Sequence, residues 1–387
     1  MQRNLPPSPG ARSRGRGVAA ASALALAAMM LTGCGGAKAE SGSAAQAAAQ
    51  PKQFSSVPKP GPAIDVSSLK GKTVYWIPIT SQAPIFSIEQ KATEQAFAVA
   101  GVSLQLCDGQ ANPAAVAKCV NQAVAAKAGG IIATSIPPEF AQQSFAKAVR
   151  AGIPVEFVNT KDATVPSDWG KGAAALPANF IEQAQLNNDL IIKDSGSKAK
   201  VLLVGVTDSS VTTSAYEVGM QKYLRDKCPG CKVATVEAGS TTLSGLASQV
   251  SAALVRNPDT QYVFVEFDSF TPPVVQALRQ LNKTRSIKLV SMLGQLDGLQ
   301  RVAGGTAFAD TGYSIAALGW NEADVLMRLM LGQDPYVAGH RTPINTFTKE
   351  TVKGLDLSEA GWLSGSWTSK DDFRSMFKTL WGVPSAG

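Results

Sequence analysis

Short apolar runs alternate with longer amphipathic stretches along residues 72–160. The apolar runs are KTVYWIPI, VSLQLCDG, GIIATSI and IPVEFVNT, and each amphipathic stretch between them spans fourteen residues or more. This alternation is typical of βαβ units, in which helices join parallel strands. The runs show little alternation of apolar and polar residues, as expected for strands that helices cover on both faces. We therefore predict four strands and three helical crossovers, which form half of a doubly wound α/β protein.

Glycine and proline mark the expected helix boundaries. Gly101, Gly129 and Gly152 each precede a predicted strand, at the place where a left-handed residue commonly ends a helix. Residues 112–113 and 137–138 supply an N-cap or a first-turn proline where the second and third helices begin.

The same alternation returns after a loop of about twenty residues that follows Thr160. Helix-like and strand-like segments alternate from residue 180 to residue 293. A strand (TAFADTGY), a helix (AALGWNEADVLMRLMLG), an extended segment (RTPINTFTKETV) and a final amphipathic helix follow. The pattern predicts that the first of these helices buries one face, which carries Leu318, Val325, Leu326 and Leu329. Two copies of a parallel unit with returning late elements predict a bilobal protein with a cleft.

The first 33 residues have the features of a secretory signal. A basic, acid-free segment precedes the apolar run VAAASALALAAMMLT, which is too short to cross about 30 Å of hydrocarbon. The run ends in Leu-Thr-Gly-Cys, which resembles the lipobox of bacterial lipoproteins, a family in which the cysteine becomes the lipidated first residue. An ordinary signal peptide with a chance cysteine is the alternative. We expect lipidation at Cys34, and a flexible tether over residues 34–63, which are rich in Ala, Ser, Gly and Pro.

The net charge and the length of the chain bear on its partners and on its number of lobes. The whole chain carries a net charge of +7, of which four charges lie in the signal, leaving +3 for the mature chain. No cluster of Lys and Arg with interleaved aromatic residues follows, so we expect no nucleic-acid partner. About 325 folded residues exceed what one hydrophobic core usually supports, which again favours two lobes.

Four cysteines remain once Cys34 carries lipid. Cys107 ends the second strand, and Cys119 lies two turns into the following helix, so the two thiols can face each other. Two buried free thiols are the alternative. Cys228 and Cys231 have the spacing of a redox motif, but a strand-like segment follows them where that motif needs a helix, so we predict a structural disulfide. Zinc is not expected, because two cysteines and one distant histidine do not fill four positions.

The order of these elements, with the segments AGIPVEFVNT, VVQALRQLN and PINTFTKETV, resembles the type I periplasmic binding proteins near their ribose- and galactose-binding branch. The resemblance covers roughly residues 72–353. It implies an α/β fold of two Rossmann-like lobes with parallel sheets, joined by a three-strand hinge. The hinge strands would lie near residues 176–180, Tyr313 and residues 342–353. The implied division is a first lobe of residues 64–178 and 313–341, and a second lobe of residues 179–312 and 342–387.

Ligands of open parallel α/β sheets bind beyond the carboxyl ends of the strands. Here these ends carry mainly neutral hydrogen-bonding side chains, which suit the hydroxyl groups of a polar solute. The candidate ligand-binding residues at these ends are Thr80, Gln82, Ser135, Asn159, Asp268, Phe270 and Gln295. For Asp268, the alternative is that it only caps the next helix.

The resemblance adds three aromatic candidates. Phe86 resembles an aromatic residue that covers a sugar ring in the family, and core packing is its alternative role. Tyr216 and Tyr313 fall about where the family offers an Arg and a Gln. Asn159 and Thr160 stand where pentose and hexose binders carry Asp-Arg. The resemblance therefore implies a cleft that is less charged and more aromatic than a ribose site.

The function that the resemblance implies is that of an extracytoplasmic solute-binding lipoprotein of an ABC importer. It would be a monomer anchored to the cell membrane by its lipid, with a sugar or sugar-like solute, permease subunits as partners and no cofactor. A ligand-binding partner of a membrane sensor is an open alternative. An enzyme is disfavoured, because His340 is the only histidine and no nucleophile, phosphate-loop or metalloprotease motif occurs. A carboxylate-dependent α/β hydrolase is the remaining rival.

Overall fold

The computed structural model describes residues 55–160 and 165–383, apart from the side chains of residues 240 and 241. The predicted signal, the lipidation site at Cys34 and residues 34–54 of the predicted tether lie outside these residues. The rest of the predicted tether, residues 55–63, is not flexible as predicted but packs on the fold, because Val57 is buried and the Pro62 carbonyl oxygen accepts a hydrogen bond from Arg328 at 2.9 Å. Within the described residues, no helix is both long enough and apolar enough to span a bilayer.

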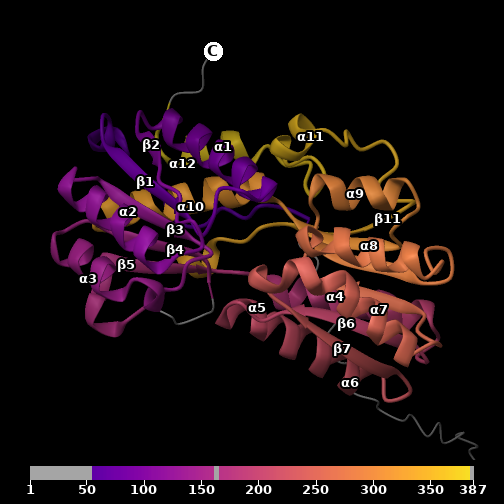
Figure 1. Ribbon diagram of the computed structural model, residues 1–387. Coiled ribbons are helices and arrows are strands. Elements are labelled where there is room, and N and C mark those ends of the chain that lie inside the picture. The colour runs from indigo at the N-terminus through magenta and orange to yellow at the C-terminus, as the bar shows by residue number, and fades with distance from the viewer. Residues whose placement is uncertain (1–54, 161–164, 384–387) are drawn as a thin grey trace, which may run out of the picture. The chain divides into compact units, whose positions relative to one another are not determined.

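The first sheet has five parallel strands in the order β2-β1-β3-β4-β5 (Figure 1). Its four leading strands and the helices between them are those that the apolar pattern predicts. The strands are β1 (Thr73–Pro78), β2 (Ser103–Leu106), β3 (Gly130–Thr134), β4 (Val155–Thr160) and β5 (Ala173–Pro177). The helices are α1 (Pro84–Val99), α2 (Pro113–Ala125) and α3 (Gln142–Arg150).

The second sheet has six strands in the order β11-β10-β9-β8-β6-β7, and only β11 is antiparallel to its neighbour. The strands are β6 (Lys200–Val206), β7 (Lys232–Ala238), β8 (Tyr262–Val265), β9 (Lys288–Leu293), β10 (Ala309–Tyr313) and β11 (Ile344–Thr348). The helices are α4 (Phe180–Asp194), α5 (Ser210–Ser214), α6 (Tyr223–Lys227), α7 (Leu246–Arg256), α8 (Thr271–Gln280) and α9 (Leu296–Ala303). Two mainly parallel α/β sheets confirm the predicted fold class.

The chain passes three times between the sheets: from β5 to α4, from β10 to α10 (Ile315–Met330), and from α10 to β11. Helix α10 packs on the first sheet and against α1. The sequence pattern predicts one buried face for α10, but every residue from Ile315 to Leu329 is buried. The close approach of α1 explains part of this, because a Cβ added at Gly319 would lie 2.7 Å from the Ala92 Cβ atom.

The last helix, α12 (Phe373–Leu380), differs from the predicted lobe division. We assigned all of residues 342–387 to the second lobe, and β11 does join the second sheet. However, α12 contacts α10, and the Trp381 ring that follows it stacks on Trp320 with ring centroids 5.3 Å apart. The Ile64 amide also donates a hydrogen bond to the Leu380 carbonyl oxygen at 2.8 Å. The end of the chain therefore packs with the first lobe, because it completes the burial of α10.

Most predicted helix boundaries are found, but two differ. Gly101 and Gly152 are left-handed, with φ of +69° and +77°, as predicted. Gly129 is not left-handed; Lys127 takes that conformation after α2, and Gly129 instead leaves room for the side chain of Met330. Residues 137–138 do not start α3: Pro137 is the N-cap and Pro138 the first residue of a short 3-10 turn, Pro138–Phe140, and α3 itself begins at Gln142.

Both predicted disulfides are present. The Cα atoms of Cys107 and Cys119 are 5.8 Å apart, and those of Cys228 and Cys231 are 5.3 Å apart. The first joins the end of β2 to α2, and the second closes the turn between α6 and β7.

Candidate solute-binding site

Asn159 and Ser135 lie at the carboxyl ends of neighbouring strands of the first sheet. Both have left-handed backbones, with φ of +54° and +58°, although neither is glycine. Asn159 occupies an irregularity in the pairing of β4 with β5, where the register shifts between Val158 and Thr160. Bulges of this kind redirect a side chain, and residues in sparsely populated conformations gather at functional sites. The local backbone therefore supports Asn159 as a site residue.

The Asn159 side chain is directed toward the crossing segment at the end of β10. Its Nδ2 donates a hydrogen bond to the Tyr313 hydroxyl oxygen at 3.5 Å, and only 4% of Asn159 and 5% of Tyr313 are exposed. This contact joins a strand end of the first sheet to a strand end of the second. It brings together two residues that were predicted independently as ligand-binding residues.

Tyr313 lies at one end of a row of three aromatic rings. Phe180 begins α4, and its ring centroid lies 6.5 Å from Tyr313 and 5.4 Å from Phe267. The three rings come from two crossing segments and the end of β8, and each is mostly buried. Such a cluster can cover the apolar face of a sugar ring. Sequence reasoning missed Phe180 and Phe267, although each lies within a few residues of the carboxyl end of a strand, β5 and β8.

A cavity of about 240 Å³ opens between the two lobes at the first turn of α1. Pro84, Ser87 and Ile88 line it from α1, and Leu296, Asp297 and Gln300 line it from α9. Phe86 lies in the same turn of α1 and is half-buried, and Thr80 and Gln82 lie in the loop before it. These three candidates are close in sequence to the residues that line the cavity, but they do not line it themselves.

Asp268 does not cap the helix that follows it, α8, whose N-terminus has no side-chain capping bond. It is fully buried, and its Oδ2 accepts a hydrogen bond at 2.9 Å from the amide of Gln295, the N-cap of α9. Burial raises the pKa of Asp268 to about 6, and Asp310 shares the same pocket. A Cβ added at Gly298 would lie 2.4 Å from both carboxylates. The prediction that Asp268 faces the solute does not fit this geometry, because the side chain points into the second lobe.

Tyr216 also lies inside the second lobe. It belongs to a π-helical turn, Ala215–Lys222, and only 1% of it is exposed. Its ring fills the space over Gly205 of β6, where an added Cβ would lie 2.0 Å from a ring carbon. The predicted cleft role of Tyr216 does not fit this position. Phe270 and Gln295 are likewise buried, with 8% and 3% exposed.

Sequence reasoning also missed three buried carboxyl groups beneath the strand ends of the first sheet. Glu89 accepts a hydrogen bond from the Thr134 hydroxyl at 2.6 Å, and Glu322 accepts one from Thr93. Burial raises the pKa of Glu89 to about 7, and it raises the pKa values of Glu156 and Glu322 well above the usual range. These groups do not reach the surface, so they set the stability of the lobe rather than contact a solute.

The single histidine is engaged inside the first lobe. His340 Nε2 lies 2.8 Å from Asp324 Oδ2, and its Nδ1 lies 3.0 Å from the Tyr336 carbonyl oxygen. Within the described ranges, no group of His, Cys, Asp and Glu side chains is arranged to hold a metal ion. The strand-end residues Asn159, Ser135 and Tyr313 and the neighbouring Phe180 and Phe267 rings are neutral, whereas the cavity beside α1 also carries the carboxylate of Asp297.

The fold and site define a two-lobed α/β binding protein. A family profile described as a periplasmic binding protein domain matches residues 74–334, and the chain belongs to this family, the type I periplasmic binding proteins. The family consists of binding proteins rather than enzymes, and it implies an extracytoplasmic location. No match was found among curated protein sequences.

Solved structures with the same fold are solute-binding proteins of ABC transporters. One is from Agrobacterium vitis and has α-D-tagatopyranose bound. It is 19% identical in sequence to this chain, with a TM-score of 0.64, and the match covers 73% of this chain and 96% of the A. vitis chain. One from Thermotoga lettingae, with bound 5-methylthioribose, is 16% identical with a TM-score of 0.65, over 84% and 99% of the two chains. One from Bacillus halodurans, with bound myo-inositol, is 15% identical with a TM-score of 0.64, over 76% and 99%.

Proposed function

We propose that this protein is the solute-binding component of an ABC importer and binds a small uncharged sugar or polyol between its lobes. The observation that carries the proposal is the Asn159–Tyr313 contact beside the rings of Phe180 and Phe267. The amide offers both a donor and an acceptor to hydroxyl groups, and the rings offer an apolar face. Contacts from both lobes reach a solute fully only when the hinge closes, so binding favours the closed state.

A thermal-shift comparison tests this proposal. D-tagatose, myo-inositol, D-arabinose and 5-methylthioribose are suitable probes, with D-glucuronate as a charged control. A sugar at 100 times its dissociation constant adds about 2.7 kcal/mol to the free energy of unfolding, which raises the melting temperature by several degrees. We expect at least one neutral sugar to do so and glucuronate to have no effect. A shift with glucuronate alone would contradict the neutral site.

The lipid anchor is a second part of the proposal and rests on the lipobox-like residues that end in Cys34. The part of the predicted tether before residue 55 would let the binding domain move near its permease while it stays at the membrane. In the Cys34→Ser variant, we expect the protein to leave the membrane fraction and appear in the soluble or secreted fraction. Cys228→Ser is the control and should stay at the membrane. Retention of the Cys34→Ser variant would rule out lipidation at this residue.

A further inference from the structure

The loop after β2 has an unfavourable backbone. Gln110 and Ala111 are consecutive residues with left-handed φ values of +52° and +50°. This conformation costs roughly 1–2 kcal/mol for a residue with a Cβ atom, and it persists only where surrounding contacts impose it. The loop must therefore be held by specific interactions, and these can be identified.

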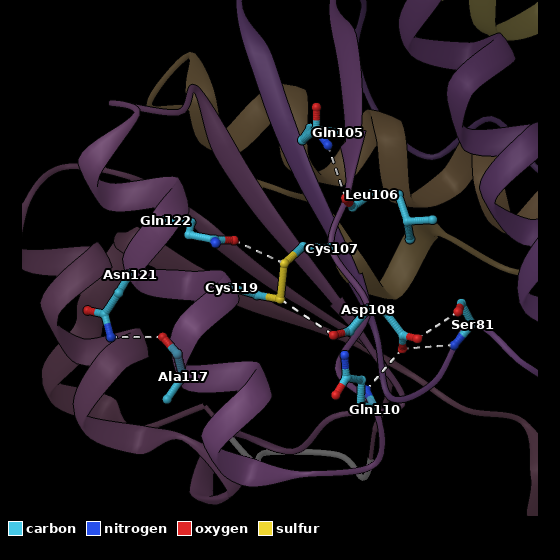
Figure 2. Close-up of a disulfide and its surroundings, with 10 residues drawn as sticks. All are labelled: Ser81, Gln105, Leu106, Cys107, Asp108, Gln110, Ala117, Cys119, Asn121 and Gln122. Carbon is cyan, nitrogen blue, oxygen red and sulfur yellow. Dashed lines mark hydrogen bonds between the residues drawn. A yellow bond between two sulfur atoms is a disulfide. The ribbon is translucent and has the colours of Figure 1, made fainter.

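Backbone and side-chain hydrogen bonds both hold this loop. The Gly109 and Ala111 amides donate to the carbonyl oxygens of Pro78 and Ile79 at 3.0 and 2.6 Å. The Asp108 carboxylate supplies the side-chain bonds. Asp108 Oδ1 accepts hydrogen bonds from the Gln110 amide at 2.9 Å and the Ser81 amide at 3.0 Å. Its Oδ2 accepts a bond from the Ser81 hydroxyl at 2.7 Å (Figure 2). Partial burial alone would raise the pKa of Asp108, but these bonds hold it below the usual value. Asp108 thus joins the loop after β2 to the loop after β1.

The neighbouring disulfide limits the freedom of this carboxylate. Cys107 precedes Asp108 and is bonded to Cys119 of α2, so the backbone next to Asp108 is attached covalently to a packed helix (Figure 2). Asn112 then starts α2, with its Oδ1 accepting a bond from the Ala114 amide at 2.8 Å. Both ends of the loop are fixed, and Asp108 is held between them.

Ser81 lies between two candidate residues of the proposed solute site. Thr80 and Gln82 flank it, and α1, with Phe86 in its first turn, follows directly. The N-cap of α1, Ala83, has no side-chain capping bond, so the start of this helix depends on the segment before it. A shift of the Ser81 segment would therefore move Phe86 as well.

We propose that Asp108, held by the Cys107–Cys119 disulfide, is a positioning residue that fixes segment 80–86 for solute binding. This inference rests on the proposed function. Asp108 itself does not contact the solute; its effect passes through Ser81. Loosening the loop would lower solute affinity because the free protein would sample other positions of the segment, and only part of the population would be ready to bind.

Hydrogen exchange on the solute-free protein tests the positioning directly. We expect the amides of Ser81 and Gln110 to exchange at least tenfold faster in Asp108→Ala, because both lose their acceptor. Asp108→Asn should stay near the wild-type rate, because its Oδ1 can accept both amide bonds and its Nδ2 can donate to the Ser81 hydroxyl. Unchanged exchange in Asp108→Ala would overturn the proposal. Exchange that is equally fast in Asp108→Asn would also overturn the proposal, because the charge of Asp108 and not its hydrogen-bonding position would then protect the amides.

Fluorescence titration with D-tagatose, D-arabinose and myo-inositol tests the consequence. We expect affinity at least tenfold weaker in Asp108→Ala and in Cys107→Ser/Cys119→Ser, and near wild type in Asp108→Asn. Cys228→Ser/Cys231→Ser is the matched control, because it removes a disulfide between α6 and β7 of the second lobe. Combining Asp108→Ala with Cys107→Ser/Cys119→Ser should weaken sugar affinity little more than either change alone, because both changes act through the same loop.

Full affinity in Asp108→Ala, or equal loss in both disulfide variants, would contradict the proposal. Ser81→Ala provides a second variant if Asp108→Ala folds poorly, and we expect it to weaken sugar binding in the same direction. Wild-type protein that binds none of the three sugars would count against the proposed function, whereas the exchange experiment would still decide whether Asp108 holds the loop.

Discussion

Glutamine in place of Glu156 should raise the free energy of unfolding at pH 7 and should lose this advantage near pH 4.5. Glu156 is fully buried on β4, and neither of its carboxyl oxygens has a hydrogen-bond partner among the described residues. Burial raises its pKa well above 4.5, and the nearby Glu322, Asp324 and Glu89 raise it further. The folded state therefore binds the Glu156 proton more tightly than the unfolded chain does.

The sign of the pH dependence follows from this difference in bound protons. Where the folded state binds more protons than the unfolded state, the free energy of unfolding falls as pH rises, here from about pH 4.5 upward. Glutamine has nearly the same shape but does not titrate, so the cost disappears. Urea unfolding at pH 5 and pH 7 measures the effect. Glu94→Gln, on the exposed face of α1, is the control and should change little at either pH. An equal gain at both pH values would contradict the explanation.

Removing the Asn159 amide should weaken sugar binding by tenfold or more. The amide contacts Tyr313, and its loss would leave a hydroxyl of the bound sugar unpaired, at roughly 1–3 kcal/mol. Asn159→Gly is the better variant because the backbone is left-handed there, and alanine would add strain that has nothing to do with the solute. We expect the melting temperature of the solute-free protein to change little.

Tyr313→Phe is the partner variant for Asn159→Gly. It removes only the hydroxyl that the amide contacts and keeps the ring beside Phe180. Isothermal titration with D-tagatose or myo-inositol should show that the two substitutions together cost less than the sum of their separate effects. Wild-type affinity in both single variants would place the sugar elsewhere.

The order of the elements could be predicted because it is a local property of the sequence. Strands such as β3 and β4 are continuous apolar runs bounded by turn residues, and only one common architecture accommodates their alternation with helices. The burial of α10 on all sides could not be predicted this way. It depends on α1 and α12, which lie far away in sequence, and on the absence of a side chain at Gly319.

The site was predicted in part for a similar reason. A position at a strand end indicates the edge of the sheet but not the direction of the side chain. Asn159 and Tyr313 meet, whereas Asp268 turns inward to the Gln295 amide, and Tyr216 fills the space above Gly205. The direction of each of these side chains depends on a contact with a residue far away in sequence, and the periodic pattern of apolar and polar residues gives no information about such contacts. The buried Glu89, Glu156 and Glu322 were missed because an acidic residue in a helix or strand is usually exposed.

Small-angle scattering of the protein with and without a sugar that raises its melting temperature tests the central claim most directly. If the sugar holds the lobes together, the radius of gyration should decrease on saturation, and Asn159→Gly should need a correspondingly higher sugar concentration for the same decrease. A radius of gyration that stays the same at saturating sugar would contradict binding by closure between the lobes.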